Sequence, residues 1–221
     1  ILPDEWPPNN MGEYGESILP VPYLEHFISN ICIDVGRQLF VDDFLIEHTD
    51  LERKFNKAKP LSNNPVFKPE TPLELGLNGN VPMAAPFSDG VWYDGESGIY
   101  KMWYQAGWFD GTAYAQSIDG ITWERVDVDI VQGTNRVLSV REGVMRDSCS
   151  VVVNNYEHIE KEKYKMFLFS RPVGGEIYSS NDGIHWSDPI NTAKLGDRST
   201  IFYNPFRKKW VYSMRSFWNQ R

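Results

Sequence analysis

One seven-residue pattern occurs twice in this chain, and the repeat constrains the fold more than any other feature. SIDGITW at Ser117–Trp123 returns as SNDGIHW at Ser180–Trp186. A second pair, YKMWYQ at 100–105 and YKMFLF at 164–169, has nearly the same spacing, 64 residues against 63. A third copy begins with WVYSMRS at 210–216. A repeat of this length indicates similar units stacked side by side.

Each unit contains four short β-strand patterns, bounded by Gly, Asp or Asn. In the first unit they are MAAPFSD, YKMWYQA, TAYAQSI and TWERV, and in the second SCSVVVN, YKMFLFS, EIYSSN and the stretch from His185. Aromatic residues, which favour strands, make up 14% of the chain. The sequence therefore predicts an all-β fold, and four antiparallel strands per unit are typical of a β-propeller blade.

We expect the 221 residues to hold an N-terminal segment and about two and a half blades. Residues 1–77 would form an extension whose GRQLFVDDFLIE stretch, 36–47, supplies one or two strands for propeller closure. Residues 78–140 would form blade one, 141–195 blade two and 196–221 the start of blade three. Because closed propellers have about 4–8 blades, we expect the remaining blades to come from further chain after this segment.

The SxDGxxW pattern predicts a tight hairpin turn with a structural role. Asp-Gly suits such turns because glycine readily adopts positive φ, and the neighbouring Ser and Asp can hydrogen-bond the turn's own backbone. The Trp that follows is expected to cover the hairpin. Each blade would close its outer hairpin in this way, which explains why the pattern recurs.

Charge and composition exclude several functional classes. Thirty acidic and 22 basic side chains give a net charge of −8, which disfavours binding to nucleic acid or to an anionic membrane. No apolar run reaches the roughly 18 residues that a membrane span requires. The four histidines lack ligand spacing, so we predict no metal site and no cofactor. Cys32 and Cys149 are expected to be buried free thiols.

Residues that begin the inner strand of a blade point toward the central funnel, where function is expected. The segments GVMRDSCSV and LGDRSTIFY place Arg146-Asp147 and Asp197-Arg198 at that point of blades two and three. Paired carboxylates are what glycosidic-bond cleavage requires, and a neighbouring arginine keeps a carboxylate ionised. We therefore take Asp147 and Asp197 as candidate catalytic acids, with Arg146 and Arg198 beside them. The alternative is that both Arg-Asp pairs lie in surface turns, where an ion pair contributes little to the stability of the fold.

Four further residues are candidates for substrate binding. Trp108 could stack on the apolar face of a sugar, and Asn80 could hydrogen-bond a hydroxyl group. Glu176, in the blade-two connection, is a candidate acid. Asp43 interrupts the apolar run LFVDDFLI, and either reaches the axis or forms a structural ion pair with Arg37 or another arginine.

The order of the YKMWYQ strand, a loop and the SxDGxxW turn resembles the five-bladed propeller glycosidases, glycoside hydrolase families 32 and 43 and their relatives. The resemblance covers residues 78–216. RDS at Arg146–Ser148 is similar to the Arg-Asp motif of the invertase-like branch, whose carboxylate binds sugar hydroxyls and stabilises the transition state. The Asn-Asp-Pro-Asn-type motif of blade one is replaced by NGNVPMAAPFSDG, with no acid before Asp89. We expect Asp89 in the turn between the first and second strands, on the opposite face. The Glu-Cys pair of blade three is also absent.

The resemblance implies a secreted or periplasmic glycoside hydrolase acting on an oligo- or polysaccharide, with retention or inversion left open. The architecture also leaves room for a structural calcium on the axis, which no residue pattern here specifies. A propeller that binds carbohydrate without cleaving it is the first alternative, because the blade-one Asp motif is missing. A sialidase-like enzyme is a weaker alternative, since the turn is similar to the sialidase Asp box.

Overall fold

The computed structural model describes residues 30, 33, 39–40, 43–76, 81–155, 162–192 and 194–215. The chain divides into two compact units, Ile1–Ala58 and Lys59–Arg221. In the first unit the described residues form turns and loops without helix or strand. The stretch 36–47 is expected to supply one or two strands, and its described residues, 39–40 and 43–47, lie outside any strand. Asp43 in particular is exposed, and its carboxylate pairs with Arg53 at 2.5 Å.

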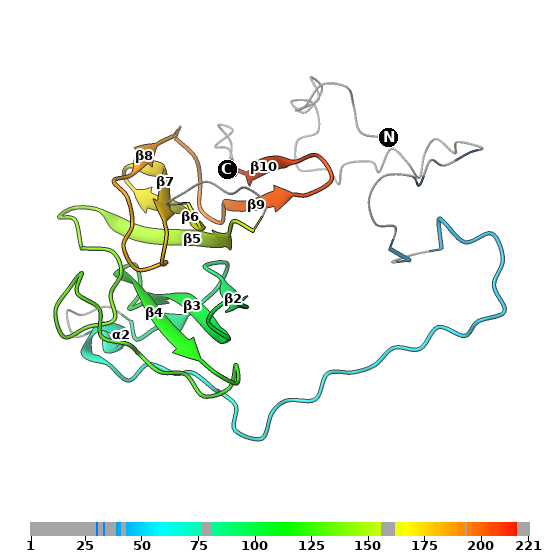
Figure 1. The fold of residues 1–221 in the computed structure, drawn as a ribbon, viewed down its shortest axis with the longest axis horizontal. Helices are drawn as coiled ribbons and strands as arrows, with labels where there is room; N and C mark the ends of the chain where they lie inside the picture. Colours follow the sequence, from blue (N-terminus) through cyan, green and yellow to red (C-terminus); the bar gives the residue numbers. More distant parts are fainter. Residues whose placement is uncertain are drawn as a thin grey trace. The chain divides into compact units, whose positions relative to one another are not determined.

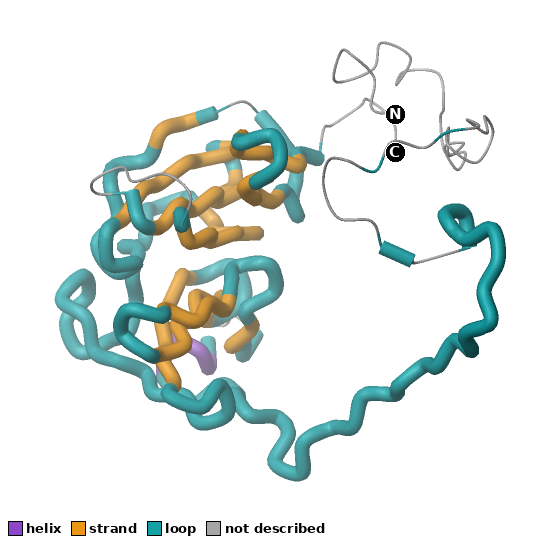
Figure 2. The backbone as a smooth tube through the Cα atoms, turned by 45° about the vertical axis from the view of Figure 1, so that its right-hand side comes forward, coloured by secondary structure: helices purple, strands orange, loops and turns teal. Residues whose placement is uncertain are grey.

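The second unit confirms the all-β prediction, since its described elements are antiparallel strands and one four-residue helix (Figures 1 and 2). The elements are α2 (Pro72–Leu75), β1 (Ala84–Ala85), β2 (Val91–Asp94), β3 (Ile99–Ala106), β4 (Gly111–Ser117), β5 (Met145–Val153), β6 (Tyr164–Arg171), β7 (Gly174–Ser180), β8 (Ile190–Asn191), β9 (Thr200–Asn204) and β10 (Lys209–Ser213).

The first sheet has an interrupted edge strand. β1 and β2 both pair with the same edge of β3, while β4 occupies its other edge. Between β1 and β2 the chain leaves the sheet at residues 86–90, where Pro86 lacks an N–H to donate and Gly90 has φ +120°. Asp89 lies in this excursion, so placing it in the turn between the first and second strands was wrong. The connection from β2 to β3 comes later, at residues 95–98.

The second sheet runs in the order β5-β6-β7-β8 and is covered on both faces. Along β5, Cys149, Val151 and Val153 belong to one hydrophobic cluster, which also contains Trp103 of the first sheet. Val152 belongs to another, which contains Ile201 of β9. The second sheet therefore lies between the first sheet and the β9–β10 hairpin, which explains why its strands are apolar on both sides.

Neighbouring sheets pack through an aromatic residue that recurs at the same place in the repeat. Trp103 of β3 is fully buried, and its indole Nε1 donates a 2.7 Å hydrogen bond to the carbonyl oxygen of Gly183. Phe167 of β6 is its counterpart one repeat later, and its ring contacts that of Tyr212 at 5.2 Å in a T-shaped arrangement. Each sheet thus presents the same kind of contact to the next.

The repeated turn has the predicted conformation in both copies. Gly120 has φ +72° and Gly183 has φ +83°. Ser117 Oγ accepts a hydrogen bond from the Gly120 N–H at 2.9 Å, and Ser180 Oγ accepts one from the Gly183 N–H at 2.8 Å. The strand after the turn is only partly formed in both copies. In the first copy it is a single bridge at Glu124, and in the second it is a bridge at Trp186 followed by β8.

The two turn glycines should respond differently to alanine. A Cβ at Gly183 would lie 2.4 Å from Trp103 Cζ2, whereas the nearest atom at Gly120 would be 3.7 Å away, in the ring of Tyr100. Gly120→Ala should cost about 1–2 kcal/mol through its left-handed backbone. Gly183→Ala should cost about 1–3 kcal/mol more because of overpacking. Urea unfolding of both variants measures this difference, and equal losses would contradict the packing of Trp103 beneath the second turn.

Candidate functional site

A cavity of about 500 Å³ lies where the starts of β5 and β9 meet the segments that follow β3 and β6. This volume is within the range of small-molecule sites, about 300–1,000 Å³. Its walls combine carboxylates, guanidinium groups and aromatic rings. The lining residues are Phe87, Ser88, Gln105, Trp108, Phe109, Asp147, Ser148, Arg171, Asp197, Arg198 and Thr200.

A β-bulge directs Asp147 toward this cavity. Arg146 pairs with Ser170 and Cys149 pairs with Leu168, so β5 contains one more residue than β6 over this interval. Bulges of this kind are frequent beside active sites because they re-aim a side chain that regular alternation would place elsewhere. Asp147, within the bulge, has a side chain that is 13% exposed and lines the cavity.

Arg146 lies behind the cavity and fixes the bulge from within. Its buried guanidinium donates a 2.7 Å hydrogen bond to the backbone oxygen of Asp147 and a 3.1 Å hydrogen bond to Thr112 Oγ1. The same group forms an ion pair with Asp89. Arg146 is not among the residues that line the cavity. Arg146 therefore holds the backbone of Asp147 in place. The sequence suggested instead that Arg146 contacts the substrate directly.

The ion-pair partner of Asp147 is Arg171, at the end of β6. Arg171 Nε and Nη2 approach Asp147 Oδ2 at 2.9 and 2.7 Å. Both contacts reach the same carboxylate oxygen, so Arg171 does not engage Oδ1 in them. The Arg171 guanidinium also lies 5.3 Å from the centre of the Phe109 ring, a cation–π distance.

Asp197 and Arg198 approach the cavity from the segment before β9. Asp197 forms an ion pair with Arg215, which does not line the cavity. Arg198 is exposed, and its backbone has φ +59°. Its N–H donates a 2.8 Å hydrogen bond to Ser148 Oγ, across from the bulge of β5. The segment before β9 and strand β5, which are distant in sequence, are thus joined at the cavity wall.

Trp108 provides an aromatic surface at the rim. Its side chain is 40% exposed, and its ring centre lies 4.7 Å from that of Phe109. The loop that carries it is held by backbone hydrogen bonds from Gly107 to Met83 and from Trp108 to Val81. A Cβ at Gly107 would come within 2.9 Å of the Leu73 carbonyl oxygen, so glycine allows α2 to pack against this loop.

Unusual backbone conformations are concentrated around the cavity. Among the described residues, four other than glycine have positive φ: Phe87, Phe109, Arg198 and Lys208. The first three line the cavity. Such conformations cost of order 1–3 kcal/mol each and cluster at functional sites, where the surrounding structure enforces them.

Asp89 is the carboxyl group with the most altered proton affinity near the site. Its side chain is fully buried, and burial raises the pKa of Asp89 to about 7, against the opposing effect of Arg146. It contacts Arg146 and does not line the cavity. Asp89, whose pKa is raised, is thus linked to Asp147 through Arg146. The sequence placed Asp89 in the turn between the first and second strands.

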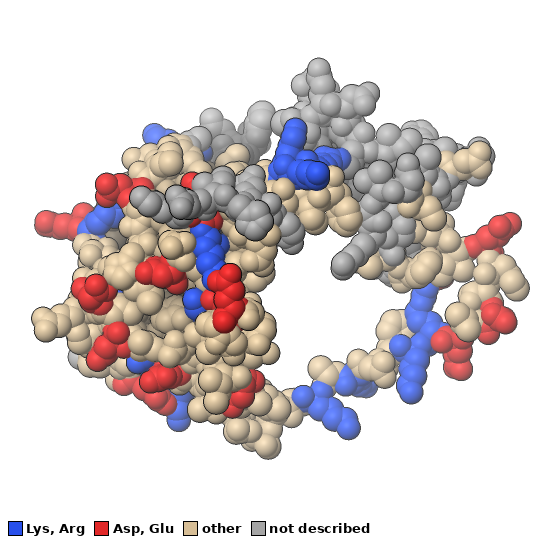
Figure 3. Space-filling view, viewed as in Figure 1, with Lys and Arg blue, Asp and Glu red and all other residues tan. Residues whose placement is uncertain are grey.

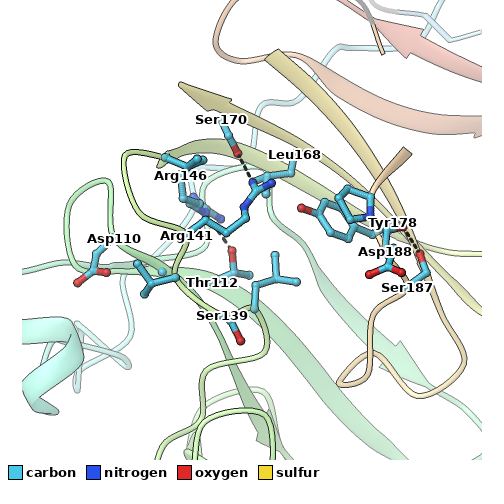
Figure 4. A pocket seen from close by; sticks show the side chains of 15 residues that line it. Asp110, Thr112, Ser139, Arg141, Arg146, Leu168, Ser170, Tyr178, Ser187 and Asp188 are labelled. Carbon is cyan, nitrogen blue, oxygen red and sulfur yellow. Dashed lines mark hydrogen bonds between the residues drawn. The ribbon is translucent and has the colours of Figure 1, made fainter. Parts of the chain in front are cut away.

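Glu176 lies apart from the cavity, in a buried ion pair. Its two carboxylate oxygens accept hydrogen bonds from Arg141 at 2.6 and 2.7 Å, and Arg141 together with Ser170 lowers the pKa of Glu176. Arg141 borders a second, smaller cavity of about 200 Å³. Figure 4 shows Arg141 directed toward Ser170, and Arg146 toward Thr112. This cavity lies between the two sheets, and its guanidinium groups are engaged by Glu176 and Asp89.

The structure thus brings four of the candidate residues together: Asp147, Asp197, Arg198 and Trp108. Arg146 supports them, and Glu176 is engaged in a separate ion pair. Asp43 lies in the first unit, paired with Arg53. Asn80 falls outside the described residues.

Sequence reasoning missed several residues that shape the cavity. Ser148 holds Arg198, Gln105 Nε2 lies 3.4 Å from the Arg146 carbonyl oxygen, and Arg215 pairs with Asp197. Ser148 could have been found, because it completes the RDS motif. Gln105 and Arg215 offered no signal, since a single polar residue within or after a strand does not reveal what it faces.

In the described part of the chain, no group of three or more His, Cys, Asp or Glu side chains could hold a metal ion. None of the helices described here is long and apolar enough to cross a membrane. Acidic and basic side chains are interspersed on the face of the second unit seen in Figure 3.

The stability of the fold should depend on the protonation of Asp89. Its pKa is higher in the folded chain than the usual 3.8, so its contribution is present at low pH and is lost as pH rises from about 4 to about 7. Asp89→Asn should remove this dependence, which is at most about 1.4 kcal/mol per pH unit. Urea unfolding at pH 5 and pH 8 measures the effect, with the exposed Asp127→Asn as control. An unchanged pH dependence in Asp89→Asn would refute the assignment.

Comparison with known proteins identifies relatives without a described activity. A segment of this chain is 32% identical over 109 residues to two uncharacterized proteins of Mycobacterium tuberculosis, one from strain CDC 1551 / Oshkosh and one from strain ATCC 25618 / H37Rv. The match covers 43% of this chain and 32% of each relative. The chain therefore spans about a third of the length of the curated relatives it matches. No family model and no solved structure matches it.

Proposed function

We propose that this protein is a glycoside hydrolase whose sugar-binding site is the 500 Å³ cavity. The observation that carries the proposal is the convergence of Asp147 and Asp197, 50 residues apart in sequence, on one cavity with an exposed tryptophan at its rim. Two carboxylates that flank one pocket are the minimum that acid- and base-assisted cleavage of a glycosidic bond requires.

The surroundings of the two aspartates suggest different roles. Asp147 is the less exposed, at 13% against 27%, and its Oδ2 receives both contacts from Arg171. In the proposed mechanism the Asp147 side chain binds sugar hydroxyls through Oδ1 and stabilises positive charge as the glycosidic bond breaks. Asp197 is the acid–base partner, because its side chain is more open and its arginine lies outside the cavity. It protonates the leaving oxygen, a water molecule then bonds to the anomeric carbon, and Asp197 takes up the proton that this water loses.

Trp108 would orient the sugar. The C–H face of a pyranose or furanose ring is apolar, so a partly exposed indole offers stacking area without requiring a hydrogen-bond partner. Its loop is fixed by the backbone bonds to Met83 and Val81. The ring is therefore held in place before substrate arrives, which reduces the entropy lost on binding.

We further propose that the two sheets and the β9–β10 hairpin are successive blades of a five-bladed propeller. The repeated aromatic contacts between neighbours and the meeting of strand starts at one cavity support this. The inner segments are also bonded in succession: the Val151 N–H donates to the Asp89 carbonyl oxygen at 2.6 Å, and Ser150 Oγ to that of Ile201 at 3.4 Å. In this proposal, further blades complete the ring.

A second candidate function is carbohydrate binding without cleavage. One observation favours it: each aspartate at the cavity is held in an ion pair with an arginine, by Arg171 and by Arg215. The carboxyl group with a raised pKa, Asp89, is buried behind the wall. A protein of this kind would bind sugars and release no product.

Substitution of the aspartates tests the proposal. Asp147→Asn and Asp197→Asn should each lower kcat/KM on a panel of oligosaccharides by about 10²- to 10⁴-fold, because proton transfer or charge stabilisation is lost. Asp127→Asn, an exposed residue away from the cavity, is the matched control. Product release is followed by chromatography and folding by thermal unfolding. Full turnover in both cavity variants would eliminate the assignment, whereas binding without turnover in the wild-type protein would favour the second candidate.

A further inference from the structure

The charged side chains that line the cavity are two aspartates and two arginines, but only one of these arginines pairs with a lining aspartate. Asp147 is neutralised by Arg171 and Asp197 by Arg215. Arg198 also lines the cavity, and within the described part of the chain its guanidinium takes part in no ion pair. Because Asp197 is paired by Arg215 from outside the cavity lining, the Arg198 guanidinium has no carboxylate partner among the described residues.

The backbone of Arg198 is held in an unusual conformation at the cavity wall. Its φ of +59° is unfavourable for a residue other than glycine. The hydrogen bond from its N–H to Ser148 Oγ helps to hold that conformation in place. Glycine would adopt it without strain, so the presence of arginine indicates that the side chain itself has a role.

A guanidinium group recognises oxyanions through a planar fork of N–H donors, which matches carboxylate and sulfate groups. Arg171 adds a second cation nearby, with a side chain that is 47% exposed although it is paired with Asp147. The cavity therefore offers a bidentate donor for a negatively charged substituent next to the carboxylates and the tryptophan.

We propose that the ligand of this cavity is an anionic sugar, with a carboxylate or sulfate group bound by Arg198. This inference rests on the proposed function, because it names the class of sugar that the same site takes. Trp108 would stack on the ring while Arg198 binds the acidic substituent. The two contacts together would fix the direction in which the sugar enters.

The net charge of −8 opposes such a ligand at long range. At physiological ionic strength, however, interactions between exposed charges are screened beyond about 8 Å. A contact at hydrogen-bond distance in a partly enclosed cavity is screened much less. The local arrangement of arginines should therefore decide the selectivity.

The test compares matched pairs of sugars. Trimers of galacturonate, glucuronate and mannuronate are titrated into the purified protein by calorimetry, alongside their methyl esters, which keep the skeleton and remove the charge. Sulfated galactose oligosaccharides and their desulfated forms make up a second arm. We expect at least one acidic member to bind about 10- to 100-fold more tightly than its neutral partner, as is typical of a charge-assisted hydrogen bond.

Variants at position 198 locate the effect. Arg198→Gly removes the guanidinium while suiting the left-handed backbone, so its Tm should be unchanged or slightly higher. It should abolish the preference for the acidic member of the pair. Arg198→Lys, which keeps the charge without the fork, should retain part of it. Arg207→Gln, in the exposed turn between β9 and β10, should keep the full preference.

The outcomes separate the two proposals. Equal affinity for charged and neutral sugars, or an acidic preference that survives in Arg198→Gly, overturns the anionic ligand and leaves sugar binding intact. Absence of binding to every sugar overturns both. An acidic preference confined to the carboxylated or to the sulfated arm supports the inference and identifies the group that Arg198 binds.

Discussion

The geometry of the candidate site depends on one buried guanidinium group. Arg146 binds Asp89 from the excursion between β1 and β2, Thr112 from β4 and the backbone of Asp147. Its removal would leave Asp89 as an unpaired buried carboxyl group, and such losses are among the more damaging single changes in a core. The same contact that joins the first two sheets therefore sets the position of a cavity residue. Structural stability and the placement of Asp147 are coupled through one side chain.

Much of the fold could be predicted because it follows from repeated motifs and from the alternation of side chains along strands. The strands at 100–106 and 164–170, the two SxDGxxW turns and the approach of Asp147 to Asp197 all follow from a repeat of about 60 residues and the alternation of strands. Each of these is a local property or a consequence of repetition. Local sequence is sufficient to predict such strands and turns when every repeated unit packs against its neighbour in the same way.

The remaining features escaped prediction for physical reasons. The excursion at 86–90, between β1 and β2, depends on the fit between Asp89 and Arg146, which lie 57 residues apart. The bulge at Asp147 depends on the register with β6, and register is a property of two strands. The roles of Arg146 and Glu176 depend on burial: both were expected to face the funnel, yet both are enclosed in ion pairs. Residue type alone does not distinguish an arginine that meets a ligand from one that meets a buried acid.

The bulge in β5 determines which positions of this strand can accept substitutions. After Cys149, side chains alternate between two hydrophobic clusters, and every position is constrained by packing on one side or the other. Before it, the additional residue releases Asp147 and Ser148 from that alternation. Substitutions can therefore change the side chains at the mouth of the cavity while the strand behind it keeps its apolar pattern, so that the cavity lining can vary without loss of the sheet.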